Sequence, residues 1–279
     1  MRLRVSHSTT YRYDPPATGV IQVLRLTPGN HDGQYVVDWR IDVSTDSRLD
    51  MREDAFGNIT HVFSYGPIAE LTFNVSGEVE TQDTGGILRG TIENFPPQFF
   101  LRPTTLTEAD ETMTAYAANL HAAAGGDPLG FLHALLTSLT DEMTFDIDPT
   151  HTGTTAGEAF KLKRGVCQDY AQIFIGCARS VGIPARFVAG HFFRSDGIVH
   201  QDAGHAWAEA YVPDLGWVGF DPANGISTTD AHVRVAIGLD YLGAAPIRGT
   251  RYGGGVETLD VQVKVDQAYR QQGQSQSQS

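Results

Sequence analysis

The sequence has few of the features that mark membrane, nucleic-acid-binding or secreted proteins. Its 279 residues contain 20 Lys and Arg against 33 Asp and Glu, which gives a formal net charge of −13. Phosphate binding requires clustered cations, so we expect no nucleic-acid partner and no anionic membrane surface as a partner. No window approaches the roughly 20 apolar residues of a membrane span, and the N-terminus shows no apolar signal-peptide core. We therefore expect a cytoplasmic protein.

Cysteine is also scarce, since Cys167 and Cys177 are the two in the chain. If both lie on one helix, a rise of about 1.5 Å per residue separates them by roughly 15 Å, which is beyond disulfide reach. Metal-binding motifs are missing too: there is no Cys-x-x-Cys pair, no His-Glu-x-x-His motif and no carboxylate-rich calcium loop. We expect no structural disulfide, no metal and no cofactor.

What the sequence does contain is the composition of an ordinary globular protein, with 41% hydrophobic and 19% charged residues over a length that can hold two domains. Up to about residue 95, strand-like runs alternate with turns. Residues 35–43 alternate apolar and polar side chains, the period-two pattern of a sheet with one solvated face. The pattern predicts an antiparallel sandwich with strands at 2–5, 21–26, 35–43, 58–65, 70–76 and 77–83.

Helical signals take over after a linker at residues 96–106, which contains three prolines and has no periodicity. Thr107 is expected to cap a helix through the Ala-rich stretch that follows. Asp127, with a proline after it, predicts the start of a second helix to about residue 139. A capping box that begins at Thr155 predicts a short third helix.

Cys167 falls where the next helix is expected to begin. Backbone N–H groups at a helix N-terminus lack intrahelical acceptors, and the macrodipole adds partial positive charge, so a thiolate is favoured there. Downstream, His205 lies on an expected strand and Asp221 ends another. A thiol nucleophile, an imidazole base and a carboxylate that orients the base are thus available in a suitable order.

The segment from about residue 155 to 225 resembles the bacterial branch of the transglutaminase-like superfamily. Four motifs in the expected order carry the resemblance: GVCQDYA (165–171), GIPAR (182–186), GHAW (204–207) and FDP (220–222). The N-terminal region resembles the β-rich domain that precedes the catalytic domain in that branch, through HSTTYRY (7–13), LTP (26–28) and DAFGN (54–58). The resemblance implies a papain-related cysteine fold acting on amide or thioester carbonyls.

Together these observations predict an α+β protein. An N-terminal antiparallel β-sandwich-like domain is followed by a transglutaminase-like catalytic domain, in which the helix that begins at the cysteine packs on an antiparallel sheet. The expected bounds are 1–95 for the β-rich domain, 96–106 for the linker, 107–250 for the catalytic domain, 251–270 for a C-terminal strand segment and 271–279 for a disordered Gln/Ser tail.

Each catalytic assignment has an alternative. Cys177 is expected on the apolar stripe of the same helix and therefore in a packing role. His191 and His200 compete with His205 as the base, but only His205 carries the Gly-His-Ala-Trp context. Asp221 could be an ordinary turn residue, because Asp-Pro is a common turn opener.

Four residues are candidates for binding substrate: Gln168 and Asp169 beside the cysteine, His191 as pocket lining, and Trp207. An acid in the first helical turn is also stabilising by itself, so Asp169 could equally serve the helix dipole. Trp207 shares a strand face with His205 by period two, although aromatic packing is the usual role of a strand tryptophan.

The leading functional hypothesis is a cysteine-dependent amidohydrolase or peptidase that works through a Cys-His-Asp triad and a thioester intermediate. The alternative is an acyltransferase of the transglutaminase type, which passes a glutaminyl acyl group to an amine. A peptide-binding scaffold without turnover is the third hypothesis, and the presence of Cys167 argues against it. A peptide or protein substrate is expected in the first two cases, and the oligomeric state is left open.

Overall fold

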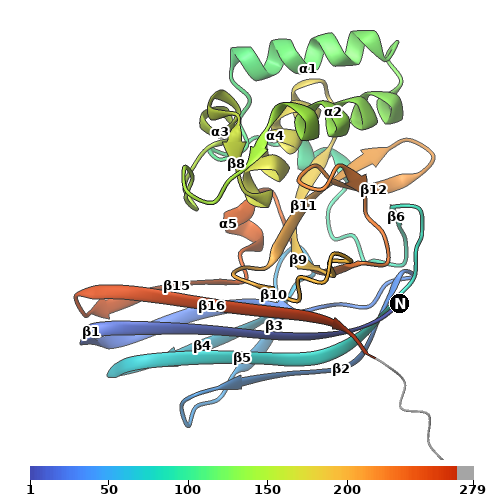
Figure 1. Ribbon diagram of the computed structural model, residues 1–279. Helices are drawn as coiled ribbons and strands as arrows, with labels where there is room; N and C mark the ends of the chain where they lie inside the picture. Colours follow the sequence, from blue (N-terminus) through green and yellow to red (C-terminus); the bar gives the residue numbers. More distant parts are fainter. Residues whose placement is uncertain (269–279) are drawn as a thin grey trace, which may run out of the picture.

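The computed structural model describes residues 1–268, so the predicted tail at 271–279 lies outside the described residues. Figure 1 shows a layer of long strands that projects to one side, beneath a part in which helices cover a smaller sheet. The sheet beneath comes mostly from the N-terminal third of the chain, and the helices come from its middle.

Strand β1 (Arg2–Thr27) organises the N-terminal part, because it pairs with different strands along its two halves. Its first half lies between β5 (Ile68–Thr81) and β16 (Val256–Gln267), and its second half lies between β4 (Ile59–Tyr65) and β15 (Ile247–Gly253). The sheet is extended by β2 (Gln34–Val43) beside β5 and by β3 (Asp50–Glu53) beside β4.

The two halves of this sheet enclose one apolar core. Phe63 of β4 and Phe73 of β5 meet edge to face within it, with ring centroids 5.3 Å apart, and Leu24 and Leu71 are fully buried beside them. Aromatic pairs in this geometry add stability beyond the area they bury. This core is the physical basis of the predicted sandwich.

Two strand predictions differ from the structure. The runs at 2–5 and 21–26 belong to the single strand β1, because pairing continues along it on both sides, interrupted by register shifts. The runs at 70–76 and 77–83 likewise form the single strand β5. Gly77 does not end that strand: a Cβ there would lie 2.4 Å from the indole of Trp39, so the glycine makes room for packing.

The C-terminal strands return to the N-terminal sheet. Residue by residue, β16 pairs antiparallel with β1 from Val256 opposite Asp14 to Gln267 opposite Leu3. On its far side the short strand β10 (His200–Gln201) pairs with β16. The expected C-terminal segment at 251–270 thus contributes the end of β15 and all of β16 to the β-rich layer, and its last two residues lie outside the described part of the chain.

The upper sheet is antiparallel and has the strand order β13-β12-β11-β9-β14, with β6 also beside β12. The bounds are β6 (Ile87–Leu88), β9 (Ala185–Phe192), β11 (His205–Val212), β12 (Gly216–Asp221), β13 (Ile226–Ser227) and β14 (His232–Gly238). A small parallel pair, β7 (Thr144–Phe145) and β8 (Arg164–Gly165), lies apart from it.

The helices are η1 (Pro97–Leu101), α1 (Glu111–Ala123), α2 (Pro128–Glu142), α3 (Ala156–Leu162), α4 (Cys167–Ser180) and α5 (Tyr241–Ala244). No helix among the described residues is both long enough and apolar enough to cross a membrane. Helix α4 is the central one and is buried along most of its length.

Helix α4 lies against the upper sheet because the facing side chains of β11 are small. Ala206, Ala208 and Ala210 alternate along that strand and belong to the same buried cluster as Phe174 of the helix. The opposite face of the sheet carries larger side chains, including Trp207, which pack in a separate aromatic cluster. This arrangement confirms the predicted α+β class, with the helix that begins at Cys167 packed on an antiparallel sheet.

The helix starts at Asp127 and Thr155 agree with the predicted caps. The predicted cap at Thr107 is wrong, because α1 begins at Glu111 and the Asp110 carboxylate accepts the N–H of Met113 at 2.9 Å. The Thr107 hydroxyl is buried and accepts a hydrogen bond from Arg179 instead. A buried guanidinium requires acceptors, and this requirement takes the threonine out of its capping role.

Candidate active site

Cys167 is the first residue of α4, and both cysteines are free. Its position is fixed by Asp169, whose Oδ2 accepts the N–H of Val166 at 2.8 Å and the hydroxyl of Thr150 at 2.7 Å. These bonds hold the turn that leads into the helix. The thiol is half-buried, in the first turn, where backbone N–H groups have no intrahelical acceptor.

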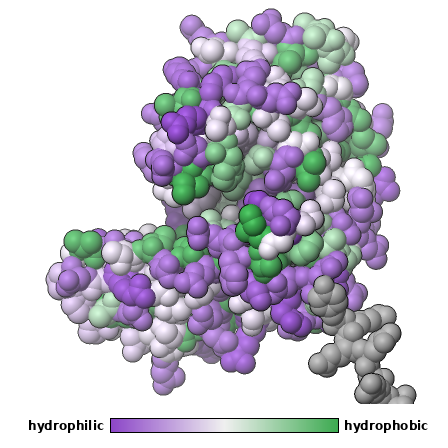
Figure 2. Space-filling view, in the orientation of Figure 1, coloured by the Kyte–Doolittle hydropathy of each residue, from purple (hydrophilic) through white to green (hydrophobic). Residues whose placement is uncertain are grey.

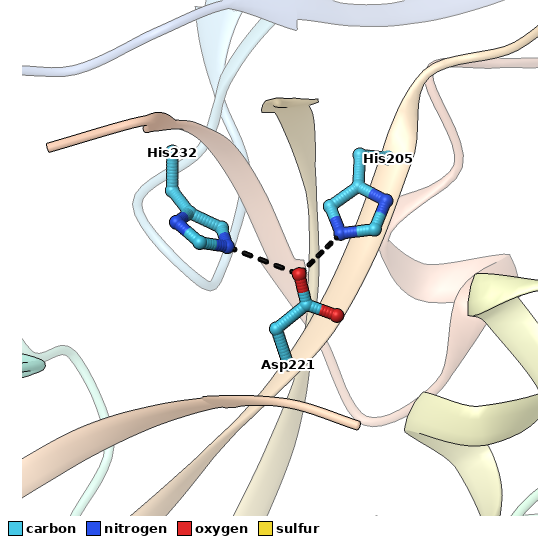
Figure 3. Close-up of side chains that lie close together, drawn as sticks. All are labelled: His205, Asp221 and His232. Atoms are coloured by element: carbon cyan, nitrogen blue, oxygen red, sulfur yellow. Dashed lines mark hydrogen bonds and ion pairs between the residues drawn. The ribbon is translucent and has the colours of Figure 1, made fainter. Parts of the chain in front are cut away.

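His205 and Asp221 lie on neighbouring strands, at the first residue of β11 and the last residue of β12. Nε2 of His205 donates to Oδ2 of Asp221 at 2.7 Å (Figure 3). Asp221 is fully buried, and the His205 side chain is 10% exposed. The sequence placed these two residues as base and orienter, and the structure brings them together.

The electrostatics of the pair favour an imidazolium beside a carboxylate. Burial opposes protonation of His205, but the Asp221 carboxylate outweighs it and raises the pKa of the imidazole; the Cys167 side chain acts in the same direction. For Asp221, burial opposes ionisation, but His205, together with His232, outweighs it and lowers the pKa of the carboxyl. Because Nε2 of His205 is occupied by Asp221, Nδ1 is the nitrogen left to exchange a proton with the thiol.

Two further residues bind the Asp221 carboxylate, and sequence reasoning did not assign either to the site. His232, at the start of β14, has its Nε2 3.1 Å from Oδ2 of Asp221. The side-chain amide of Asn224 donates to the same oxygen at 2.7 Å. The signal for Asn224 was its place in the loop after Asp-Pro, whereas no sequence pattern pointed to His232.

The His205, Asp221 and His232 groups lie within 4.8 Å of one another, a spacing that could hold a metal ion. Their hydrogen bonds assign another role. The N–H of Thr229 donates to Nδ1 of His232 at 3.1 Å, so in the neutral ring Nε2 carries the proton and donates to Asp221. A nitrogen that carries a proton offers no lone pair to a metal, and the set is therefore a hydrogen-bonded chain.

The four predicted substrate-binding residues do not lie together in the structure. Gln168 is half-buried beside Cys167, whereas Asp169 is 1% exposed and makes the turn contacts described above.

Trp207 is 2% exposed and packs with Trp217 in the aromatic cluster behind His205. His191 is buried between β9 and the N-terminal sheet, against His7 and Trp39. Of the four, only Gln168 has a partly accessible position next to the thiol.

The remaining alternatives, His200 as the base and Cys177 as a second thiol, lie outside this group of side chains. His200 is exposed on β10, where it pairs with Lys264 of β16. Cys177 is completely buried in the core, and burial raises the pKa of its thiol to about 12. Cys167 and His205, in contrast, interact directly with each other.

A buried ionic cluster supports the same sheet. Arg186 is 0% exposed and binds Glu93 and Glu209, and its guanidinium lies 3.9 Å from the ring centroid of Trp217. Arg234 binds the other oxygen of Glu209 at 2.7 Å. For Glu209, burial opposes ionisation, but the two arginines outweigh it and lower the pKa of the carboxyl. The cluster ties β9, β11 and β14 together beneath the site.

Comparisons with known proteins agree with this geometry. Residues 114–222 match the family model of the transglutaminase-like superfamily, and residues 3–80 match that of the bacterial transglutaminase-like N-terminal region. An uncharacterized protein of Mycobacterium leprae is 31% identical over 279 residues, covering 95% of this chain and 98% of that protein.

Two further matches bear on fold and chemistry. A solved structure from Cytophaga hutchinsonii, described provisionally as a cysteine protease, has a TM-score of 0.76 at 17% identity and covers 95% of this chain and 90% of that one. This likeness shows the fold. A protein-glutamine gamma-glutamyltransferase of Pseudomonas aeruginosa is 31% identical over an alignment of 163 residues, which covers 52% of this chain and 22% of that protein.

Proposed function

The chain belongs to the transglutaminase-like superfamily, and from that premise we propose that it is a cysteine-dependent amidohydrolase or peptidase. The observation that carries the proposal is the 2.7 Å hydrogen bond from His205 to the buried Asp221 carboxylate, with Cys167 interacting with the same imidazole at the start of α4. A nucleophile, a base and an orienting carboxylate are thereby held on three rigid elements.

The reaction begins when the Cys167 sulfur attacks the carbonyl carbon of an amide, while its proton resides on Nδ1 of His205. The C=O π bond opens to an oxyanion, and the backbone N–H of Cys167 is a donor placed to stabilise it. When the C–N bond breaks, His205 gives its proton to the leaving nitrogen. The products of this half-reaction are the free amine or ammonia and a thioester on Cys167.

The second half-reaction restores the thiol. Water attacks the thioester carbonyl, His205 accepts one proton from that water, and the C–S bond breaks as the proton returns to sulfur. Throughout, Asp221 holds the tautomer of His205 and stabilises the imidazolium, which it can do because it stays ionised. General acid–base help of this kind contributes roughly 10² to 10⁴ in rate.

Acyl transfer to an amine is the second candidate, and the similarity to the glutamyltransferase of Pseudomonas aeruginosa favours it. The same three residues would form the same thioester, and an amine would replace water in the second half-reaction. A binding scaffold without turnover is a weaker candidate, because the chain retains Cys167 in its reactive position.

The proposal includes a peptide or protein as substrate and a cytoplasmic location, with neither nucleic acid nor membrane as a partner. The formal charge of −13 supports the exclusion of nucleic acid, since phosphate binding needs clustered cations. In Figure 2 the face shown is mostly hydrophilic, and the projecting β layer meets the helical part at a hollowed corner.

Incubation with a glutamine-containing peptide and a labelled primary amine separates the two enzymatic candidates. Hydrolysis predicts release of ammonia without incorporation of the amine, and transfer predicts incorporation. The Cys167→Ala variant is the control, because either product must vanish with the nucleophile. Ammonia release that persists in the variant would exclude both candidates.

A further inference from the structure

Asp221 is held by two histidines that come from different strands. His205 of β11 and His232 of β14 both point an Nε2 atom at Oδ2 of Asp221, at 2.7 and 3.1 Å, and the carboxylate is fully buried between them (Figure 3). Only His205 has the thiol as a neighbour on its other side. His232 therefore has the geometry of a residue that acts on the carboxylate and not on the substrate.

The His232 ring has little freedom to do anything else. Phe192 packs over it with ring centroids 4.7 Å apart, and Trp207 meets it edge to face at 5.2 Å. The N–H of Thr229 binds Nδ1 from the preceding turn. These two ring contacts and a fixed hydrogen bond at one nitrogen orient the other nitrogen, Nε2, toward Asp221.

A neutral donor is the useful form of His232 in this position. A second imidazolium on Oδ2 would neutralise the carboxylate that His205 needs, whereas a neutral N–H holds the oxygen and leaves its negative charge in place. The surroundings agree with this form, because burial, together with the nearby His205, lowers the pKa of His232 even though Asp221 raises it. The carboxylate then has a fixed orientation and a full charge.

We propose that His232 is a positioning residue, which through its Nε2–H holds the Asp221 carboxylate in the orientation that stabilises the His205 imidazolium. The inference rests on the proposed Cys-His-Asp chemistry and adds a fourth residue to it. The titratable groups that face this site from the surrounding elements are Cys167 of α4, His191 of β9 and Tyr241 of α5.

The test is the pH dependence of alkylation of Cys167 by iodoacetamide, which needs no known substrate. At pH 6 an ordinary cysteine is almost entirely thiol, so reactivity there depends on the His205 imidazolium, whereas at pH 10 a thiolate forms without help. We expect His232→Leu to slow alkylation at pH 6 by roughly 10- to 100-fold and to leave the rate at pH 10 within about twofold of wild type.

Two matched variants complete the test. His232→Gln places an amide N–H where Nε2 was and should keep the pH 6 rate within about threefold of wild type. His200 is exposed and provides the control: His200→Leu should leave the alkylation rates at pH 6 and pH 10 unchanged. An unchanged pH 6 rate in His232→Leu would overturn the inference, while a wild type in which Cys167 is no more reactive than Cys177 at pH 6 would overturn the proposed function with it.

A loss of folding in His232→Leu would appear as labelling of the buried Cys177. In that case an NMR measurement of the His232 tautomer in the wild-type protein tests the inference. Long-range ¹H–¹⁵N correlation spectra at pH 7 should show His232 neutral, with its proton on Nε2. A proton on Nδ1, or a charged ring, would overturn the inference.

Discussion

His7 of β1 meets His191 of β9 edge to face, with ring centroids 5.8 Å apart and an interplanar angle of 86°. The contact joins the N-terminal sheet to the sheet that carries the candidate active site. Both side chains are at most 4% exposed, and neither has an acid bound to it among the described residues. Burial lowers the pKa of His7 to about 4 and that of His191 to about 3.

This contact predicts a loss of stability in mild acid. A histidine whose folded pKa lies below the ordinary value of about 6.5 stabilises the protein fully above pH 6.5, and this stability is lost as the pH falls toward the folded pKa. At pH 5 each of the two histidines lowers the free energy of unfolding by about 2 kcal/mol relative to its value above pH 6.5. Urea unfolding at pH 7, 6 and 5 measures the effect.

The control is His191→Phe, which keeps an aromatic ring at the contact but cannot titrate. Between pH 6 and pH 5 the slope of its unfolding free energy should be smaller than that of wild type by up to about 1.4 kcal/mol per pH unit. A slope identical to that of wild type would show that His191 does not carry the acid sensitivity.

The two cysteines predict selective labelling. Cys167 is half-buried at the start of α4 beside His205, whereas Cys177 is completely buried and its thiol pKa is raised to about 12. Iodoacetamide should modify Cys167 in the native protein at neutral pH and Cys177 only after unfolding. Peptide mapping by mass spectrometry measures both rates, and native Cys167→Ala should take up almost no label. Equal rates for the two thiols would contradict this arrangement.

The buried ionic cluster predicts a large loss of stability when one partner is removed. Arg186→Met leaves Glu93 and part of Glu209 without their cation, in a site where Arg186 is 0% exposed. An uncompensated buried charge costs about 3–5 kcal/mol. The matched control is Arg194→Gln, because Arg194 binds Asp196 in a pair that is 40% and 48% exposed, where solvent screens the attraction and its loss should barely change stability. Equal midpoints in chemical denaturation of the two variants would refute the distinction.

The contacts of Asp169 predict that its role is to hold the turn before Cys167. Asp169→Asn retains an oxygen that can accept the N–H of Val166, while Asp169→Leu retains none. We expect the asparagine variant to keep most of its Cys167 alkylation rate and the leucine variant to lose about 1–3 kcal/mol of stability together with reactivity. The contrary outcome is an asparagine variant that keeps its alkylation rate but binds an amine substrate much more weakly, which would show that the carboxylate recognises that amine.

Much of the fold, and the three central residues of the candidate site, could be predicted from the sequence because the signals are local. Residues 165–171 and 204–207 lie in compact motifs, and the caps at Asp127 and Thr155 act on N–H groups two or three residues away. Cys167 at the helix start, with His205 and Asp221 at strand ends, follows from such local patterns.

What the sequence could not supply depends on contacts between distant segments. His232 begins β14 and Asp221 ends β12, and the two meet although β9 and β11 lie between these strands in the sheet. No local pattern encodes that meeting. Asp110 caps α1 in place of Thr107, whose hydroxyl accepts a hydrogen bond from the buried Arg179 far along the chain. Trp207 shares its strand face with His205 as period two requires, but Phe100 of η1 and Trp217 of the neighbouring strand β12 pack around it and bury it.

The central claim is that Cys167 is the nucleophile of an amide-cleaving reaction. The most direct test is to incubate wild type and Cys167→Ala with a library of peptides and amides, and to follow cleavage and ammonia release by mass spectrometry. The account predicts cleavage by wild type that is lost in Cys167→Ala while the variant keeps the wild-type fold. Cleavage that continues at the same rate in Cys167→Ala would contradict it.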